Sequence, residues 1–222
     1  MLQEDYLIRM IRLAVAALMT IFGLKREGNY QQAMDLIAVS LTQLTGMDDR
    51  MLNALDDASL LGILSNRQGP DYERMLIVAD LLKESGEVYA ALVQPVESRA
   101  GYLRALTLYL ETALGPVEYP PEELGARIDS VLAGLGRQQP LPLESLYPLW
   151  YFFEKNHRYG QAIQALDDLF RQTGSDPELK EQGLAFYRRL AHLEDAELEA
   201  GGAQRITVME KALQLKATGK TI

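Results

Sequence analysis

The chain lacks cysteine altogether, and its basic residues are outnumbered by its acidic ones. The absence of cysteine excludes disulfides, thiolate metal sites and a cysteine nucleophile. It also fits a reducing cytoplasm, which is the location we expect. The 22 Lys and Arg residues stand against 31 Asp and Glu residues, so the net charge is −9. Because nucleic-acid binding needs Lys and Arg to replace phosphate counterions, we expect no nucleic-acid partner.

A hydrophobic run long enough to cross a membrane is missing as well. Leu13 to Leu24 is an uncharged run of 12 residues, whereas a membrane-spanning helix needs about 20 apolar residues. Glu4 and Asp5 precede this run, so the basic, acid-free start of a signal peptide is absent. We therefore expect a helix that remains in the mature protein and no membrane span. Arg9 and Arg12 leave a second interpretation open, in which this helix lies beside lipid headgroups.

Common catalytic signatures are absent from the chain. There is no Gly-x-Ser-x-Gly nucleophile turn, no Gly-x-x-x-x-Gly-Lys phosphate loop and no Gly-x-Gly-x-x-Gly. Glu154 and His157 match Glu-x-x-His, but a di-iron site needs two such pairs and two further carboxylates. For His192 we expect a structural role. We predict no catalytic residue, no cofactor, no metal and no enzymatic activity.

An acidic cluster before residue 60 could suggest calcium. It contains Asp48, Asp49, Asp56 and Asp57. The EF-hand spacing, with its central glycine and terminal glutamate, is missing from this stretch. We therefore interpret these aspartates as caps of two short helices.

The clearest folding signal is a helical hairpin between Leu146 and Thr173. Each half has an apolar stripe at helical spacing, and the turn from Lys155 to Arg158 joins them. Two such stripes so close in sequence must fold back on each other. The stripes consist of Leu146, Leu149, Trp150 and Phe153, then Ala162, Ile163, Leu166, Leu169 and Phe170.

Similar helical patterns cover the rest of the chain. The first helix is predicted from about Gln3 to Lys25 and is apolar on most of its circumference. We expect neighbouring helices to cover it on several sides, and a homodimer through this helix is the alternative. Gly134 to Pro142 predicts a break between an N-terminal half, residues 1–134, and a C-terminal half, residues 143–217. We expect the two halves to form one continuous structural unit.

Three predicted helix starts share the pattern Tyr-x-x-Ala. A small alanine lets two helix backbones approach closely where they cross, and a tyrosine at the turn packs across the hairpin. Stacked hairpins of this kind form a solenoid. The three stretches are Tyr30 to Ala33, Tyr102 to Ala105, and Tyr159 to Ala162.

These stretches resemble the tetratricopeptide repeat, whose turn reads Gly-x-Tyr-x-x-Ala. Gly28, Tyr30 and Ala33 match it, and Trp150 stands near the family's early aromatic position, whereas His157 replaces the glycine. The three signatures are 72 and 57 residues apart, which are not multiples of a period of about 34. The resemblance therefore implies an all-α fold of degenerate tetratricopeptide-like hairpins stacked as a short solenoid. An irregular helix bundle is the alternative.

The N-terminal part also resembles an uncharacterised bacterial family, a domain of unknown function. The stretch from Gln3 to Ile11 and the Gly-Asn-Tyr turn carry this resemblance, which covers chiefly residues 1–65. It implies a cytoplasmic helical protein and transfers no activity and no catalytic residue.

Stacked hairpins predict a non-enzymatic interaction module that holds a protein or peptide in a groove. The net charge would suit a partner of basic character. A regulator that responds to a ligand or peptide is the first alternative, and an unrecognised enzyme with a helical pocket is the second. Tyr151 or Phe152 must point away from the partner helix of its hairpin. The candidate groove residues are Tyr72, Arg99, Tyr151, Arg188 and Arg189.

Overall fold

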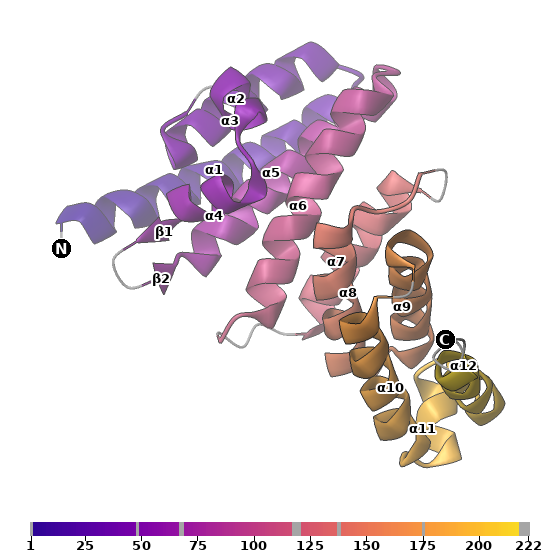
Figure 1. Ribbon diagram of the computed structural model, residues 1–222. Coiled ribbons are helices and arrows are strands. Elements are labelled where there is room, and N and C mark those ends of the chain that lie inside the picture. Colours follow the sequence, from indigo (N-terminus) through magenta and orange to yellow (C-terminus); the bar gives the residue numbers. More distant parts are fainter. Residues whose placement is uncertain are drawn as a thin grey trace. The chain divides into compact units, whose positions relative to one another are not determined.

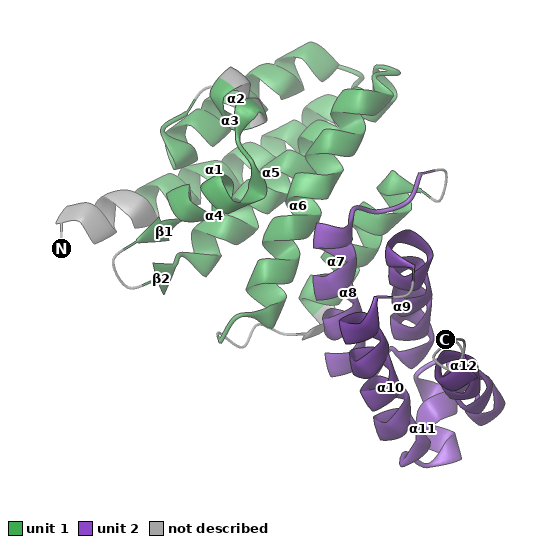
Figure 2. Ribbon diagram, viewed as in Figure 1, with its two compact units in different colours: residues 1–138 green, residues 139–222 purple. Residues whose placement is uncertain are grey.

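The computed structural model is almost entirely helical, which confirms the all-α prediction (Figure 1). It describes the backbone of residues 2–47, 49–66, 69–116, 121–136, 139–174 and 176–217. The chain divides into two compact units, Met1–Gln138 and Gln139–Ile222 (Figure 2). This division falls inside the Gly134 to Pro142 stretch, and each unit is described separately below.

Unit 1 is built around helix α5, which packs against α1, α2, α6 and α7. A two-residue antiparallel ladder, with Ser65 opposite Pro70, lies between α4 and α5. The elements of unit 1 are α1 (Leu2–Arg26), α2 (Tyr30–Thr45), α3 (Asp49–Ala54), α4 (Asp57–Ile63), β1 (Ser65–Asn66), β2 (Gly69–Pro70), α5 (Tyr72–Ala91), α6 (Pro95–Leu114) and α7 (Pro121–Leu135).

The predicted capping residues fix several of these helix ends. The Asp56 carboxylate accepts a 2.7 Å hydrogen bond from the Ser59 amide and caps α4, as the acidic cluster indicated. Gly46 ends α2 in the left-handed conformation, with φ of 74°. Asp48, the first member of that cluster, lies outside the described residues.

Two glycines bring the backbones of α5 and α6 into contact. A Cβ atom at Gly101 would lie 3.0 Å from the carbonyl oxygen of Leu82, and one at Gly86 would lie 3.1 Å from that of Ser98. Gly86 therefore serves packing and does not break the helix, because α5 continues to Ala91. This close contact makes α5 and α6 the central pair of unit 1.

Tyr102 lies inside α6, so the prediction that it starts a helix is wrong. Its ring packs on α7, where a Cβ atom at Gly134 would lie 2.4 Å from the Tyr102 Cζ atom. The second Tyr-x-x-Ala stretch is thus a helix-packing motif and not a hairpin turn. Ala105 is nevertheless fully buried, as the close-approach argument requires.

A polar stripe of four residues runs along α5, and its first member joins three helices. The Asp80 carboxylate accepts a 2.5 Å hydrogen bond from the Tyr109 hydroxyl of α6. It also accepts one of 3.0 Å from Arg127 Nη1 of α7. Burial raises the pKa of Asp80 despite these two donors, and burial beside Asp80 raises the pKa of Tyr109. The stripe consists of Asp80, Lys83, Glu84 and Glu87.

The two glutamates of the stripe bind α1 through Lys25, and Lys83 of α5 pairs with both of them. Lys25 pairs with both Glu84 and Glu87, and Lys83 Nζ lies 2.6 Å from Glu87 and 3.2 Å from Glu84. Burial alone would raise the pKa of Glu87, but the hydrogen bonds from Lys25 and Lys83 bring it below its usual value. The cluster therefore favours ionised Glu87 in the folded state.

We predict that Lys25→Met destabilises the chain in a pH-dependent way. At pH 7 it should cost about 1–2 kcal/mol, because two half-buried carboxylates lose a donor. The depressed pKa of Glu87 contributes stability above the unfolded value near 4.5, and this contribution disappears as the pH falls through the folded value. Urea unfolding followed by circular dichroism at pH 7 and pH 3.5 measures the difference.

Arg12→Met is the matched control, because Arg12 is exposed on the same helix. It should cost less than about 0.5 kcal/mol at either pH. An equal cost of Lys25→Met at both pH values would contradict the proposed role of Glu87.

The turn between α5 and α6 holds a strained residue. Val93 has φ of 59° and is 85% exposed. A β-branched residue is disfavoured in the left-handed region because its side chain crowds the backbone. Nothing in this exposed position compensates for the strain through packing.

We predict that Val93→Gly raises the free energy of unfolding by about 0.5–1 kcal/mol. The relief of backbone strain outweighs the entropy that glycine adds to the unfolded chain. Thermal unfolding measures the gain. Val96→Gly is the control, because Val96 is also exposed but lies in the first turn of α6; it should destabilise, and a stabilising effect of the same size would show that strain is not the cause.

α1 is not covered on several sides by the described part of the chain, which corrects the expectation for the first helix. Met10, Ala14 and Ile21 are buried, whereas Met19 and Phe22 are 73% and 56% exposed. Among the described residues no helix is both long and apolar enough to cross a membrane.

Unit 2 contains the hairpin predicted between Leu146 and Thr173. Helices α8 and α9 pack together, and α10 packs on α12. The buried rings of Trp150 and Phe186 meet edge to face at 5.6 Å and connect α8 with α10. The elements are α8 (Leu143–Lys155), α9 (Tyr159–Thr173), α10 (Pro177–Ala191), α11 (Asp195–Ala200) and α12 (Arg205–Ala217).

Candidate binding surface

The turn between α8 and α9 places His157 in the left-handed conformation, with φ of 56°. The amide of Arg158 donates to the carbonyl of Phe153 at 2.8 Å. The side chain of Asn156 donates to the carbonyl of Phe152 at 2.8 Å. These bonds close α8 and fix the turn. His157 therefore occupies the conformation that favours glycine, which is the residue the tetratricopeptide turn would have there.

A short chain of polar groups joins this turn to α11. The Tyr159 hydroxyl donates to Glu197 Oε1 at 3.2 Å, and His157 Nδ1 lies 2.6 Å from the Tyr159 oxygen. The tautomer with hydrogen on Nδ1 satisfies both contacts. Burial and then the Glu197 carboxylate raise the pKa of Tyr159. The phenol therefore stays protonated at neutral pH and acts as a donor, not as a base.

The turn between α11 and α12 lies directly on the start of α9. The amide of Gly160 donates to the carbonyl of Gly201 at 2.9 Å. A Cβ atom at Gly160 would lie 2.3 Å from the Gly202 carbonyl oxygen, and one at Gly201 would lie 2.3 Å from the Tyr159 ring. Only glycine fits at both positions.

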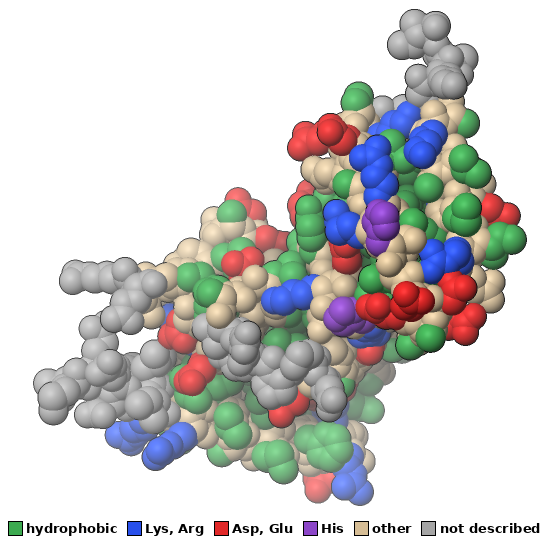
Figure 3. Space-filling model, turned by 90° about the horizontal axis from the view of Figure 1, so that it is seen from below, with side chains coloured by type: hydrophobic (Ala, Val, Ile, Leu, Met, Phe, Trp, Pro, Cys, Tyr) green, Lys and Arg blue, Asp and Glu red, His purple; other side chains and the backbone are tan. Residues whose placement is uncertain are grey.

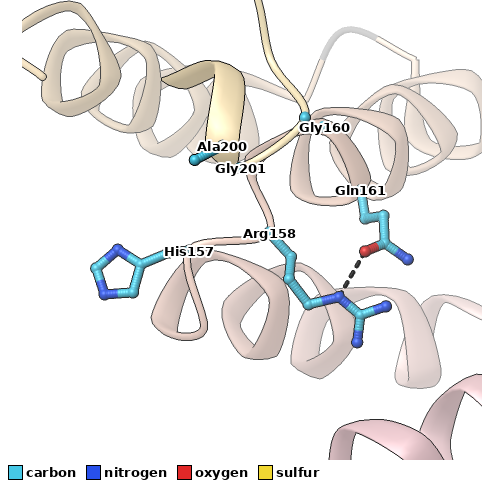
Figure 4. Close-up of a pocket in the computed structure, with 7 residues that line it drawn as sticks. His157, Arg158, Gly160, Gln161, Ala200 and Gly201 are labelled. Atoms are coloured by element: carbon cyan, nitrogen blue, oxygen red, sulfur yellow. Dashed lines mark hydrogen bonds between the residues drawn. The ribbon is translucent and has the colours of Figure 1, made fainter. Parts of the chain in front are cut away.

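A hollow of about 400 Å³ opens beside this glycine contact (Figure 4). Arg158 Nε donates to Gln161 Oε1 at 2.5 Å across it, and the Arg158 guanidinium also lies 4.8 Å from the centre of the Phe153 ring. Figure 4 shows the His157 ring pointing away from the Arg158–Gln161 pair. The lining residues are His157, Arg158, Gly160, Gln161, Ala200, Gly201 and Gly202.

We predict that Gly160→Ala destabilises unit 2 by about 1–3 kcal/mol. The new Cβ would overlap a backbone oxygen that cannot move aside as a flexible side chain does. Circular dichroism follows the unfolding of the whole chain, and fluorescence of Trp150, the single tryptophan, reports unit 2 separately. Gly62→Ala is the control, because nothing lies within 4 Å of its Cβ position in α4. A Gly160→Ala protein as stable as the Gly62→Ala protein would contradict the glycine contact.

A second surface of unit 2 lies where α8 faces α10. Arg189 of α10 binds the Glu154 carboxylate of α8 through two hydrogen bonds, of 2.7 Å and 3.0 Å. Tyr151, one turn before Glu154, is 49% exposed, and its ring lies 5.4 Å from that of Trp150. Arg188 is exposed beside Arg189. We call Tyr151, Glu154, Arg188 and Arg189 the α8–α10 face.

Residues 1–217 match the model of a protein family, a family of unknown function (DUF6483). The chain belongs to this family. The match covers both units, and so extends beyond the N-terminal 65 residues on which the sequence resemblance was based. Neither a curated protein nor a solved structure matches the chain significantly.

The five candidate groove residues fall into three places. Tyr151 and Arg189 lie close to each other and to Glu154, and Arg188 is exposed on α10 next to Arg189 in the sequence. Tyr72 is half-buried at one end of the α5–α6 hairpin, where a Cβ atom at Gly115 would lie 2.7 Å from its ring. Arg99 is half-buried in the second turn of α6, near the other end of that hairpin. Tyr72 and Arg99 therefore do not line one site together, and a binding role for any of the five stays a prediction.

The contacts made by two residues on these surfaces, Glu154 and Glu197, were not predicted from the sequence. The sequence placed Glu154 in a Glu-x-x-His motif, but in the structure its carboxylate binds Arg189. Glu197 was not singled out, although Tyr159 at the repeat turn was a signal for a contact across the hairpin. In the parts of the chain that the structure describes, no group of three or more His, Cys, Asp or Glu side chains could hold a metal ion.

Proposed function

We propose that this protein is a non-enzymatic interaction module that holds a protein or peptide segment on the α8–α10 face. The observation that carries the proposal is the exposed ring of Tyr151 between two fixed contacts. Beneath it lies the Trp150–Phe186 pair. Beside it lies the two-bond Glu154–Arg189 ion pair.

Such a surface has the features of a binding hot spot. Tyr, Trp and Arg dominate the energetically important positions of protein interfaces. A tyrosine on a rigid backbone loses little conformational entropy when it binds. Arg188 is an exposed cation on α10, one residue before Arg189, while Arg189 is held in place by Glu154. The face therefore offers one apolar anchor and one directional charge.

The acidic residues next to this face favour a partner that also has basic character. Glu194, Glu197 and Glu199 are exposed on or beside α11, and Tyr159 ties this helix to the α8–α9 turn. Figure 3 shows acidic side chains gathered beside histidine and basic ones on one side of the molecule. With a net charge of −9, the chain would attract a basic partner over distance. Arg188 would then select an acceptor group at contact.

A regulator that responds to a small ligand is the second candidate. The hollow beside His157 and Arg158 supports it, because its lining joins the α8–α9 turn to the α11–α12 turn. A ligand there would act on the contact between the two turns. Neither proposal includes a catalytic step.

The test of the interaction module is a capture experiment with matched variants. The tagged full chain is purified gently from its native cell, and any stoichiometric protein is identified by mass spectrometry and then prepared pure. Tyr151→Ala with Arg188→Ala should weaken binding of the pure partner at least about tenfold, because hot-spot residues each contribute more than 1 kcal/mol. Isothermal titration calorimetry measures the affinity.

Met209→Ala is the control, because Met209 is exposed on α12 of the same unit. It should leave the affinity unchanged. A partner that binds the double variant as tightly as the natural chain would refute the α8–α10 face. Absence of any stoichiometric protein, together with a thermal shift by a small molecule, would favour the regulator.

A further inference from the structure

The outward side of α1 is an apolar face on a long helix. Exposed and buried positions alternate with the helical period between residues 9 and 26, so that one side meets unit 1 and the other does not. The exposed large apolar side chains of this helix are Leu13, Val15, Met19 and Phe22.

Between residues 9 and 26, the exposed charged side chains of α1 are all arginines. Arg9, Arg12 and Arg26 are exposed, and the Arg26 guanidinium lies 5.9 Å from the centre of the Phe22 ring. Lys25 instead faces α5, where it pairs with Glu84 and Glu87. The sequence from Arg9 to Arg26 contains no acidic residue. The face is therefore locally cationic in a chain whose net charge is −9.

We propose that this side of α1, the α1 outer face, docks on the surface of an anionic lipid bilayer. It consists of Arg9, Arg12, Leu13, Val15, Met19, Phe22 and Arg26. The apolar side chains enter the boundary between headgroups and acyl chains, and the arginines at both ends bind lipid phosphates. The inference is independent of the function proposed for unit 2.

The geometry of the face suits a flat anionic surface. The arginines at its ends are 17 residues apart, so the stripe is roughly 25 Å long at about 1.5 Å per residue. Arginine stems can lie along apolar surface while their guanidinium groups reach the headgroups. The helix lies parallel to the membrane in this arrangement, because it is too short in apolar residues to cross it.

Charge makes a second copy of the chain a poorer occupant. In a two-fold dimer the same face would lie on both sides. Three arginines would then meet three arginines, with no acidic residue between Arg9 and Arg26 of either helix to pair with them. Lipid phosphates supply the opposite charge that a second α1 lacks.

Vesicle sedimentation of the full chain tests the proposal. Vesicles of phosphatidylcholine with an equal share of phosphatidylglycerol are compared with pure phosphatidylcholine vesicles at 0.1 M salt. We expect binding to the anionic vesicles and little binding to the neutral ones. Replacement of Arg9, Arg12 and Arg26 by Gln should lower partitioning to the anionic vesicles roughly 100-fold, at about fivefold per arginine.

Two further variants separate the face from other exposed apolar surface. Met19→Ser with Phe22→Ser should also abolish most binding. Met209→Ser with Leu213→Ser is the control, because both residues are exposed on α12, and it should bind normally. Circular dichroism verifies the fold of each variant.

Four results would overturn the proposal. The first is no binding of the chain to anionic vesicles, and the second is equal binding to both vesicle types, which would show that lipid charge plays no part. A dimer detected by light scattering and dissociated by the Met19→Ser and Phe22→Ser changes, without vesicle binding, would assign the face to a second copy. A protein that binds this face in the absence of vesicle binding would assign it to an acidic partner.

Discussion

Backbone contact at glycine sets the geometry of both units. In unit 1, Gly86 and Gly101 let α5 and α6 touch along their backbones. In unit 2, the amide of Gly160 donates a hydrogen bond to the carbonyl of Gly201, which lies in the turn between α11 and α12. A side chain at these positions would push the elements apart, because interiors are packed too densely to absorb even one added carbon.

Aromatic and charged side chains then complete the space around these contacts. The Tyr102 ring occupies the space where Gly134 has no side chain, and the Tyr159 ring does the same at Gly201. Because α5 packs against four helices, the polar groups that these contacts bury need partners within unit 1. Asp80 is bound by Tyr109 and Arg127. Groups satisfied in this way hold helices together, and the surfaces proposed to bind partners lie elsewhere, on exposed side chains.

Local signals in the sequence identified much of the fold. Helix periodicity predicted the α8–α9 hairpin, and Gly28 was matched to the glycine of the tetratricopeptide turn; it has positive φ. The alanines of the three Tyr-x-x-Ala stretches, Ala33, Ala105 and Ala162, are fully buried. Each of these features depends on neighbours within a few residues. Tetratricopeptide-like stacking of hairpins into a solenoid stays a prediction.

Features that depend on distant partners were missed. Lys25 and Glu84 are 59 residues apart, and Arg189 and Glu154 are 35 apart; no periodic pattern connects them. The close contact between Gly86 and Gly101 was not predicted either, because a glycine in a helix does not specify which backbone it faces. The exposure of α1 could not be foreseen either, since an apolar circumference indicates burial without specifying what covers it. Of the candidate groove, only the cluster around Tyr151 came together.

Each unit is a rigid scaffold held together by glycine contacts. These scaffolds leave the α8–α10 face and the α1 outer face exposed. Hydrogen exchange of the full chain at pH 7, read by mass spectrometry, tests this most directly. We predict that the amides of residues 101–110 and 162–169 exchange slowest, near the rate of global unfolding, and that the amides of residues 209–216 exchange much faster. Exchange in 101–110 or 162–169 as fast as in 209–216 would contradict it, because the glycine contacts would then not hold the units together.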